Sequence, residues 1–204
     1  MDSLLALFPL ELVLLPWESL PLHVFEPRYK EMVGECLSEK RPFGVVRSTD
    51  NKVSEIGCTA EIIELQKRYD DGRMDILTAG RRRFEIVSLD QQRSFLRAEV
   101  TYIDDEAEEA PAAEIARALD LHTQIVRLVG PNAAYEPPSA AEPQLSYRLA
   151  ASLPIDIDFK QILLGMRAEP DRIAALVEFY REVLPKLDRA RMNREKAGGN
   201  GHIH

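Results

Sequence analysis

The fold of this 204-residue chain is decided by the stretch Leu20-Pro21-Leu22-His23-Val24-Phe25-Glu26-Pro27-Arg28-Tyr29. Residues 22–25 favour a short extended segment after the turn at Pro21. Pro27 suits the first position of a helix, because its missing N–H is one that the first helical turn leaves unpaired anyway. Apolar residues then recur at helical spacing, so the sequence predicts one amphipathic helix over residues 27–38.

Short strands are predicted on both sides of this corner. The apolar residues 10–15 predict a strand that is covered on both faces and ends at Pro16, and residues 43–46 predict another. The runs 60–69 and 73–78 are joined by Asp70-Asp71-Gly72, where glycine supplies the positive φ that a tight β-hairpin requires.

A further strand pair is predicted over residues 83–89 and 94–103. Six or seven short strands with one helix indicate a closed or partly closed barrel over residues 1–104.

The second half of the chain changes to helical periodicity. Residues 112–129 predict a helix that Gly130-Pro131 stops, and residues 144–153 predict a short one. Asp158 is expected to cap the next helix, with Gln161 in the capping-box position. A last helix begins near Pro170, and Pro185 is expected to kink or end it.

The predicted fold class is therefore α+β, a barrel subdomain followed by a helical bundle over residues 105–192. The tail over residues 193–204 is predicted to be disordered. Residues 104–109 hold five carboxylates in six positions, which could form a cation site or a solvated linker. They contain no glycine-bearing calcium loop, so the linker is favoured and no metal is expected.

The composition narrows the classes of function. The net charge of −8 and the pI of about 5.1 count against a nucleic-acid binder, which needs clustered basic residues. Cys36 and Cys58 are too few for a disulfide framework and fit buried thiols in a reducing compartment. The first seventeen residues lack the basic start of a signal peptide, and no apolar run reaches about 20 residues. A cytoplasmic protein without membrane contact is expected, and the oligomeric state stays open.

Two groups of motifs carry a family resemblance. The first group is residues 20–29 with Leu7-Phe8-Pro9-Leu10 and Phe43-Gly44-Val45-Val46. The second group is Ile56-Gly57-Cys58-Thr59-Ala60, Asp71-Gly72-Arg73 and Ala79-Gly80-Arg81-Arg82-Arg83-Phe84. Together they resemble the amino-terminal domain of Lon proteases. A looser match follows at residues 150–154 and 160–164, where Gly165 replaces the usual glutamate.

The resemblance implies a PUA-like β pseudo-barrel, a small helical bundle and recognition of unfolded or tagged polypeptides. In full-length Lon, ATPase and protease modules follow this domain. This sequence contains no G-x-x-x-x-G-K-[ST] loop to hold nucleotide phosphates, and its assigned halves leave no length for a Ser–Lys peptidase domain. A non-catalytic module without a cofactor is therefore expected.

His23, Phe25, Glu26 and Arg28 are candidate site residues within the family motif. A histidine near a carboxylate could act as a general base, but no serine or cysteine in the motif suggests itself as a nucleophile. In the structural interpretation, His23 and Glu26 satisfy main-chain groups at the corner and Arg28 pairs with Glu26 or a neighbouring carboxylate.

Two other features are candidates for binding. Trp17 lies in a proline-flanked loop, either as an exposed anchor for a peptide or as a plug at one end of the barrel. Arg81, Arg82 and Arg83 form a basic cluster that could hold an RNA backbone or coat a solvated sheet face. The leading hypothesis is a binding module for unfolded or peptide segments, with a role as an adaptor in protein quality control; the alternative is an RNA-binding protein.

Overall fold

The computed structural model describes residues 4–50, 52–130 and 136–199, and over them the chain forms two compact units. One comprises Met1–Asp105 with Pro154–Arg167, and the other Glu106–Leu153 with Ala168–His204. They are called the β unit and the helical unit below. Residues 154–167 thus cluster with the strands, whereas the sequence places them in the bundle. Their side chains explain the difference, because Lys160 bonds to Glu18 and Gln161 donates to the Ile56 carbonyl.

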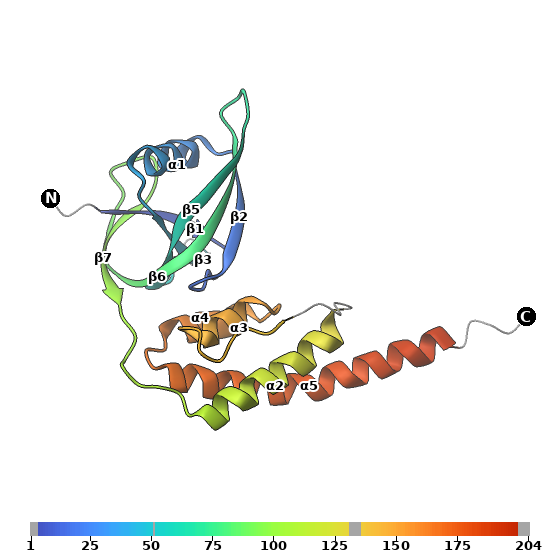
Figure 1. Ribbon diagram of the computed structural model, residues 1–204. Helices are drawn as coiled ribbons and strands as arrows, with labels where there is room; N and C mark the ends of the chain where they lie inside the picture. The colour runs from blue at the N-terminus through green and yellow to red at the C-terminus, as the bar shows by residue number, and fades with distance from the viewer. Residues whose placement is uncertain (1–3, 51, 131–135, 200–204) are drawn as a thin grey trace, which may run out of the picture. The chain divides into compact units, whose positions relative to one another are not determined.

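The β unit is a closed ring of strands with a helix packed against it (Figure 1). The ring order is β1-β7-β6-β5-β3, and parallel pairing of β3 with β1 closes it. Strand β2 pairs with β6 outside this path, and β4 pairs with β3. The bounds are β1 Leu5–Leu10, β2 Ser19–Val24, β3 Phe43–Thr49, β4 Lys52–Val53, β5 Ile56–Arg68, β6 Met74–Asp90, β7 Arg97–Ile103 and α1 Pro27–Glu39. The barrel expected from the sequence is confirmed.

Helix α1 begins at Pro27, as the sequence predicts, and buries one face. Tyr29, Met32, Val33 and Cys36 are its buried residues. The Tyr29 ring lies 4.0 Å from that of Phe8 on β1, so this face of the helix completes the apolar interior.

The strand predicted over residues 10–15 is wrong, because β1 ends at Leu10. Residues 13–15 are buried, but they lie in an irregular segment that leads into a tight turn. The turn is closed by hydrogen bonds between Leu15 and Glu18, and Trp17 has a φ of 69°. A nearly continuous run of apolar residues indicates that a segment is buried on both sides. It does not by itself show that the segment pairs with another strand.

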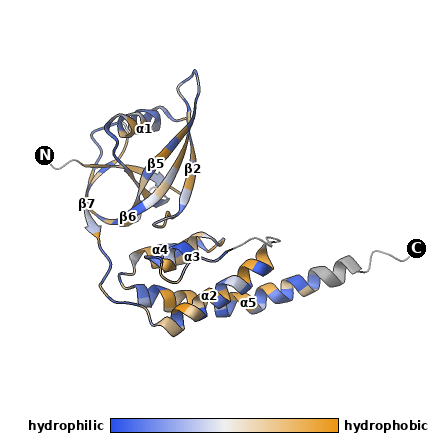
Figure 2. Cartoon of the chain, viewed as in Figure 1, coloured by the Kyte–Doolittle hydropathy of each residue, from blue (hydrophilic) through white to orange (hydrophobic). Residues whose placement is uncertain are grey.

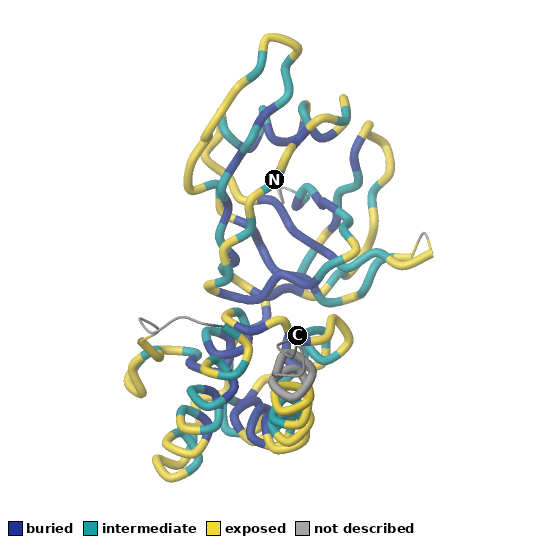
Figure 3. Tube along the Cα trace, turned by 90° about the vertical axis from the view of Figure 1, so that its right-hand side faces the viewer, coloured by how far each residue is buried: buried dark blue, intermediate teal, exposed yellow. Residues whose placement is uncertain are grey.

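The hairpin at residues 70–72 is confirmed. Gly72 has a φ of +83°, and the Tyr69 N–H donates to the Arg73 carbonyl at 2.9 Å. Strand β6 then runs without interruption from Met74 to Asp90, where the sequence predicts two separate strands. The projecting hairpin is largely exposed, whereas the ring below it is buried (Figure 3).

Helix α4, Ile157–Gly165, is capped by Asp156 and not by the predicted Asp158. The Asp156 carboxylate accepts from the N–H groups of Asp158 and Phe159, while the Asp158 side chain pairs with Arg47 at 2.5 Å. The Asp156→Ala substitution is expected to lower the free energy of unfolding by about 1 kcal/mol, because it removes the cap.

Urea denaturation followed by the fluorescence of Trp17 measures this change. The Asp158→Ala substitution serves as the comparison, because the Asp158 side chain is exposed. It is expected to lower the free energy of unfolding by less than about 0.5 kcal/mol. A larger loss for Asp158→Ala than for Asp156→Ala would contradict the assignment of the cap.

The helical unit contains α2, Ala112–Val129, α3, Leu145–Ala151, and α5, Glu169–Gly199. Apolar and polar residues are interleaved along α2 and α5 (Figure 2), and Ile173, Leu176 and Tyr180 are fully buried on α5. Helix α5 continues through Pro185 and reaches Gly199, although the sequence predicts a kink or an end at Pro185 and a disordered tail from residue 193. Residues 192–197 are mostly good helix formers, which accounts for the continued helix. The last part of the predicted tail, residues 200–204, lies outside the described residues. None of the described helices is both long and apolar enough to cross a membrane.

His122 on α2 is fully buried and shares a hydrogen bond of 2.8 Å with the Ser152 hydroxyl. Burial lowers the pKa of His122 from 6.5 to about 4, against a smaller opposing effect of the hydrogen bond with Leu149. The unfolded chain therefore binds one more proton between these two pH values. With respect to this histidine, the folded state is most stable above pH 6.5, where the side chain is neutral in both states. This stability is lost as the pH falls toward 4.

Between pH 6.5 and 4, the free energy of unfolding of the helical unit is therefore expected to fall by up to about 1.4 kcal/mol for each unit by which the pH is lowered. The His122→Gln variant should have a shallower dependence, because its side chain does not titrate. Far-ultraviolet circular dichroism of urea unfolding at pH 7, 6 and 5 measures both chains. Equal slopes would contradict a buried neutral histidine.

Candidate functional site

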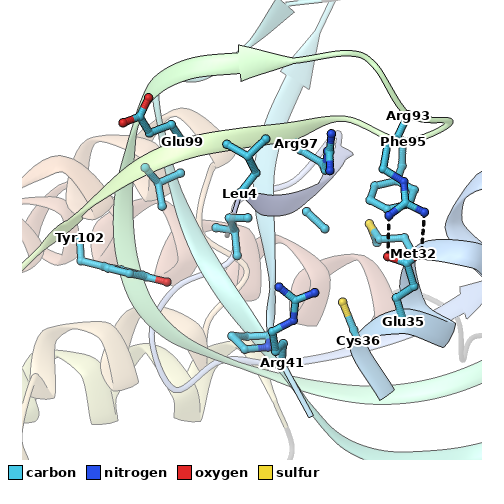
Figure 4. Close-up of a pocket in the computed structure, with 14 residues that line it drawn as sticks. Leu4, Met32, Glu35, Cys36, Arg41, Arg93, Phe95, Arg97, Glu99 and Tyr102 are labelled. Atoms are coloured by element: carbon cyan, nitrogen blue, oxygen red, sulfur yellow. Dashed lines mark hydrogen bonds and ion pairs between the residues drawn. The ribbon is translucent and has the colours of Figure 1, made fainter. Parts of the chain in front are cut away.

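A hollow of about 760 Å³ opens in the β unit between α1, the start of β1, and β7 (Figure 4). Its apolar wall includes Leu5, Met32, Phe95 and Val100. In Figure 4 the side chains of Arg41, which follows α1, and Tyr102, on β7, both border this hollow. The hollow therefore combines an apolar surface with hydrogen-bonding groups, as ligand sites in proteins commonly do.

A second hollow of about 530 Å³ adjoins the first, and both are lined by Cys36, Arg41, Pro42 and Tyr102. It lies between the end of α1 and strands β5, β6 and β7, and Lys40, Ile62, Arg81 and Arg82 are among its lining residues. The two hollows together are called the groove. Basic side chains outnumber acidic ones along the groove, in a chain whose net charge is −8.

The arginines near the first hollow are held by carboxylates. Arg93 donates to Glu31 at 2.7 Å and also pairs with Glu35, and both contacts raise the pKa of the guanidinium. Arg97 pairs with Asp90 at 2.8 Å. These pairs fix the shape of the wall, so its arginines are positioned before a ligand arrives.

The predicted basic cluster at residues 81–83 divides into two environments. Arg83 is buried and donates to main-chain carbonyls of α4, so it is not part of a surface patch. Arg81 pairs with Glu61 at 2.5 Å, and Arg82 lies over the Tyr102 ring at 4.0 Å. Only Arg81 and Arg82 line the groove, and the three-arginine surface expected for an RNA backbone is not formed.

Trp17 is 41% exposed, which rules out the interpretation as a plug of the barrel. Its ring lies 5.6 Å from the Arg81 guanidinium, close to the second hollow. An exposed tryptophan beside an arginine is a composition typical of binding surfaces.

The family-motif histidine belongs to a different cluster, outside the groove. His23 Nδ1 lies 2.5 Å from Asp75 Oδ1, and the Tyr69 hydroxyl donates to Asp75 Oδ2 at 2.8 Å. These two hydrogen bonds, that of His23 first, hold the pKa of the Asp75 carboxyl below its usual value. Phe25 is 59% exposed and stacks beside His23.

The roles predicted for the corner residues are met in part. Arg28 pairs with Glu26 at 2.9 Å, as the structural interpretation expects. His23 pairs with Asp75 and not with a main-chain group, and the Glu26 side chain makes no capping bond to α1. Sequence reasoning missed Asp75 and Tyr69, because only the pairing of β2 with β6 brings them to His23.

The two cysteines are not suited to act as nucleophiles. Cys36 and Cys58 are free and buried, and burial raises the pKa of their thiols to about 11 and about 12. Over residues 4–50, 52–130 and 136–199, no three histidine, cysteine or acidic side chains gather as metal ligands would. In the carboxylate run, Asp104 and Asp105 instead pair with Arg82 and Arg83.

Residues 5–181 match the family model of the ATP-dependent protease La (LON) substrate-binding domain. The chain belongs to the Lon substrate-binding domain family. It is 28% identical over 193 residues to Lon protease 2 of Syntrophobacter fumaroxidans. The aligned region covers 86% of this chain but only 24% of that protease. The chain thus spans about a quarter of the length of this protease.

Solved structures of Lon amino-terminal domains share the fold. A Lon N-terminal domain protein from Xanthomonas campestris superposes with a TM-score of 0.70 at 24% identity, covering 86% of this chain and 98% of that one. The N-terminal domain of Lon protease from the Mycobacterium avium complex gives 0.62 at 16% identity, with 88% and 98% covered. The α+β architecture of this Lon substrate-binding domain is therefore that of Lon amino-terminal domains.

Proposed function

We propose that this Lon substrate-binding domain binds unfolded or peptide segments of other proteins in the groove, and that it acts by binding and not by catalysis. The observation that carries the proposal is the groove itself, in which Met32, Phe95 and Val100 lie beside arginines. A surface of this kind can accept apolar side chains while its polar groups bind main-chain or charged groups. The family match supports the class of ligand.

The test is binding of the purified full chain to a fluorescent, permanently unfolded protein, prepared by reduction and carboxymethylation. Fluorescence anisotropy should show saturable binding, and the folded form of the same protein should not compete. Tyr102→Ala is expected to weaken binding by about fivefold or more, because it removes a side chain shared by both hollows.

Val87→Ala is the matched control, since Val87 is 58% exposed on β6 and does not line the groove. Equal affinity of the wild-type and Tyr102→Ala chains would exclude the groove as the site. Absence of binding to any unfolded protein, or displacement of the ligand by single-stranded RNA at physiological salt, would overturn the proposal.

The proposal extends to a cellular role, that of an adaptor in protein quality control within the cytoplasm. The kinship with a Lon protease and the two free, buried thiols, which suit a reducing compartment, support it. Adding the chain to a purified Lon protease should change the rate at which an unfolded substrate is degraded. An unchanged rate over a range of chain concentrations would count against the adaptor role.

A further inference from the structure

Part of one edge of β7 is unpaired among the described residues, beside the groove. Strand β1 pairs with β7 at Leu5 and Ala6 and then crosses to β3, with which residues 7–10 pair. Among the described residues, the part of β7 from Glu99 to Ile103 therefore pairs with β6 alone. Glu99, Val100 and Tyr102 of this part line the groove.

The main-chain groups that face the groove follow from the hydrogen bonds at the start of β7. The Leu7 N–H donates to the Leu96 carbonyl at 2.8 Å, so the peptide groups of Leu96 point toward β1. In an antiparallel strand successive residues direct their N–H and C=O groups to opposite edges, so every second residue faces the same edge. The groups of Val100 and Tyr102 therefore point to the same edge as those of Leu96.

The neighbouring strand gives the same assignment. Val100 is the register partner of Ile86 on β6, and the Ile86 N–H donates to Glu55 on the side of β5. Ile86 and Val100 therefore do not exchange hydrogen bonds, which leaves the Val100 peptide groups directed into the groove. An exposed strand edge with free donors and acceptors is a template for another strand.

The side chains around this edge select an acidic partner. Arg82 stacks on Tyr102, and its contact with Asp104 is long, at 3.4 Å, with side chains 56% and 85% exposed. Arg41 lines the same hollow as Tyr102, and its contact with Glu39 is also between exposed side chains. Such exposed pairs contribute little, so a carboxylate on a bound segment can replace the present partners.

We infer that the groove takes an extended, acidic polypeptide segment that adds as a strand to β7 at Glu99–Ile103, with its carboxylates on Arg41 and Arg82. This inference rests on the proposed function and specifies its ligand. Main-chain hydrogen bonds to Val100 and Tyr102 supply affinity without sequence preference, and the arginines supply the preference for charge.

The experiment uses fluorescein-labelled peptides of about ten residues, long enough to cover the free part of β7. One alternates glutamate and valine, and its control alternates lysine and valine. Two further versions of the acidic peptide carry N-methyl groups on all odd or all even positions. In a strand only alternate N–H groups reach the partner strand, so one version should bind at least about tenfold more weakly and the other about as the parent does.

The protein variants test the charge preference. Arg41→Glu with Arg82→Glu is expected to weaken binding of the acidic peptide at least about tenfold, because two attractive charges become repulsive. Lys67→Glu with Arg68→Glu on the exposed hairpin changes the net charge by the same amount, and this control should change the affinity by less than about twofold. Circular dichroism of the double variant checks that it is folded.

Equal sensitivity to both N-methyl patterns, or preference for the lysine peptide, would overturn the inference. So would binding that appears only after residues 1–3 are removed, because the edge would then belong to the chain's own first residues. If the unfolded protein binds and the acidic peptide does not, strand addition fails and the proposed function stands. If neither binds, both fail.

Discussion

Replacing Arg83 by methionine is expected to lower the free energy of unfolding of the β unit by about 3–5 kcal/mol. Arg83 is 2% exposed, and its Nη1 donates to the carbonyls of Leu164 and Met166 at 2.9 and 2.6 Å. Its Nη2 pairs with Asp105 at 2.5 Å. Methionine fills much of the volume, but it removes the hydrogen bonds that Arg83 donates to the Asp105 carboxylate and to the two carbonyls at the end of α4.

Urea denaturation followed by Trp17 fluorescence measures the loss, since Trp17 is the single tryptophan and lies in the β unit. Arg82→Met is the matched control, because the contact of Arg82 with Asp104 is between exposed side chains. This variant should change the free energy of unfolding by less than about 0.5 kcal/mol. A loss below about 1 kcal/mol for Arg83→Met would mean that the buried guanidinium does not hold α4 to the strands.

The second large effect is expected at Gly80 in β6. A Cβ placed there would lie 2.9 Å from the Leu15 carbonyl carbon and closer still to its oxygen. Gly80 also exchanges main-chain hydrogen bonds with the 15–18 turn, accepting from Trp17 and donating to Glu18, each at 2.9 Å. Gly80→Ala should therefore lower the free energy of unfolding by about 3 kcal/mol, because main-chain atoms must move apart.

Gly34→Ala provides the opposite expectation from the same exchange of residues. No atom lies within 4 Å of the Cβ position at Gly34 in α1, so alanine adds helix propensity without a clash. This variant should be more stable by about 0.5–1 kcal/mol in the same denaturation experiment. A Gly80→Ala chain as stable as the wild type would show that the turn can shift away from β6 at little cost.

The local chemistry of single residues explains the elements that the sequence predicts well. Pro27 at the start of α1 and Gly72 in the hairpin act through their own backbone preferences, and the structure places both as expected. The errors have a different origin. Val13, Leu14 and Leu15 are apolar and buried, but their main chain lies outside the strands, and strand partners are not encoded in a local pattern.

The residues of the groove also divide into those that local sequence indicates and those that only the tertiary structure brings together. The sequence singles out Trp17 and residues 81–83, but it cannot tell that Arg83 is buried under α4 while Arg82 lies on Tyr102. Nor does it join Arg41 to β7, because these residues are far apart in the chain and meet only when the ring closes.

The family, the α+β class and the positions of most helices and turns can be predicted from the sequence, because motifs, periodicity and cap chemistry act over a few residues. The burial of single arginines, the pair of strands that carries the His23–Asp75 contact and the point where β7 stops pairing with β1 among the described residues all follow from tertiary structure. These features depend on register and closure between distant segments, and hydrogen bonds between such segments leave no periodic trace in the chain.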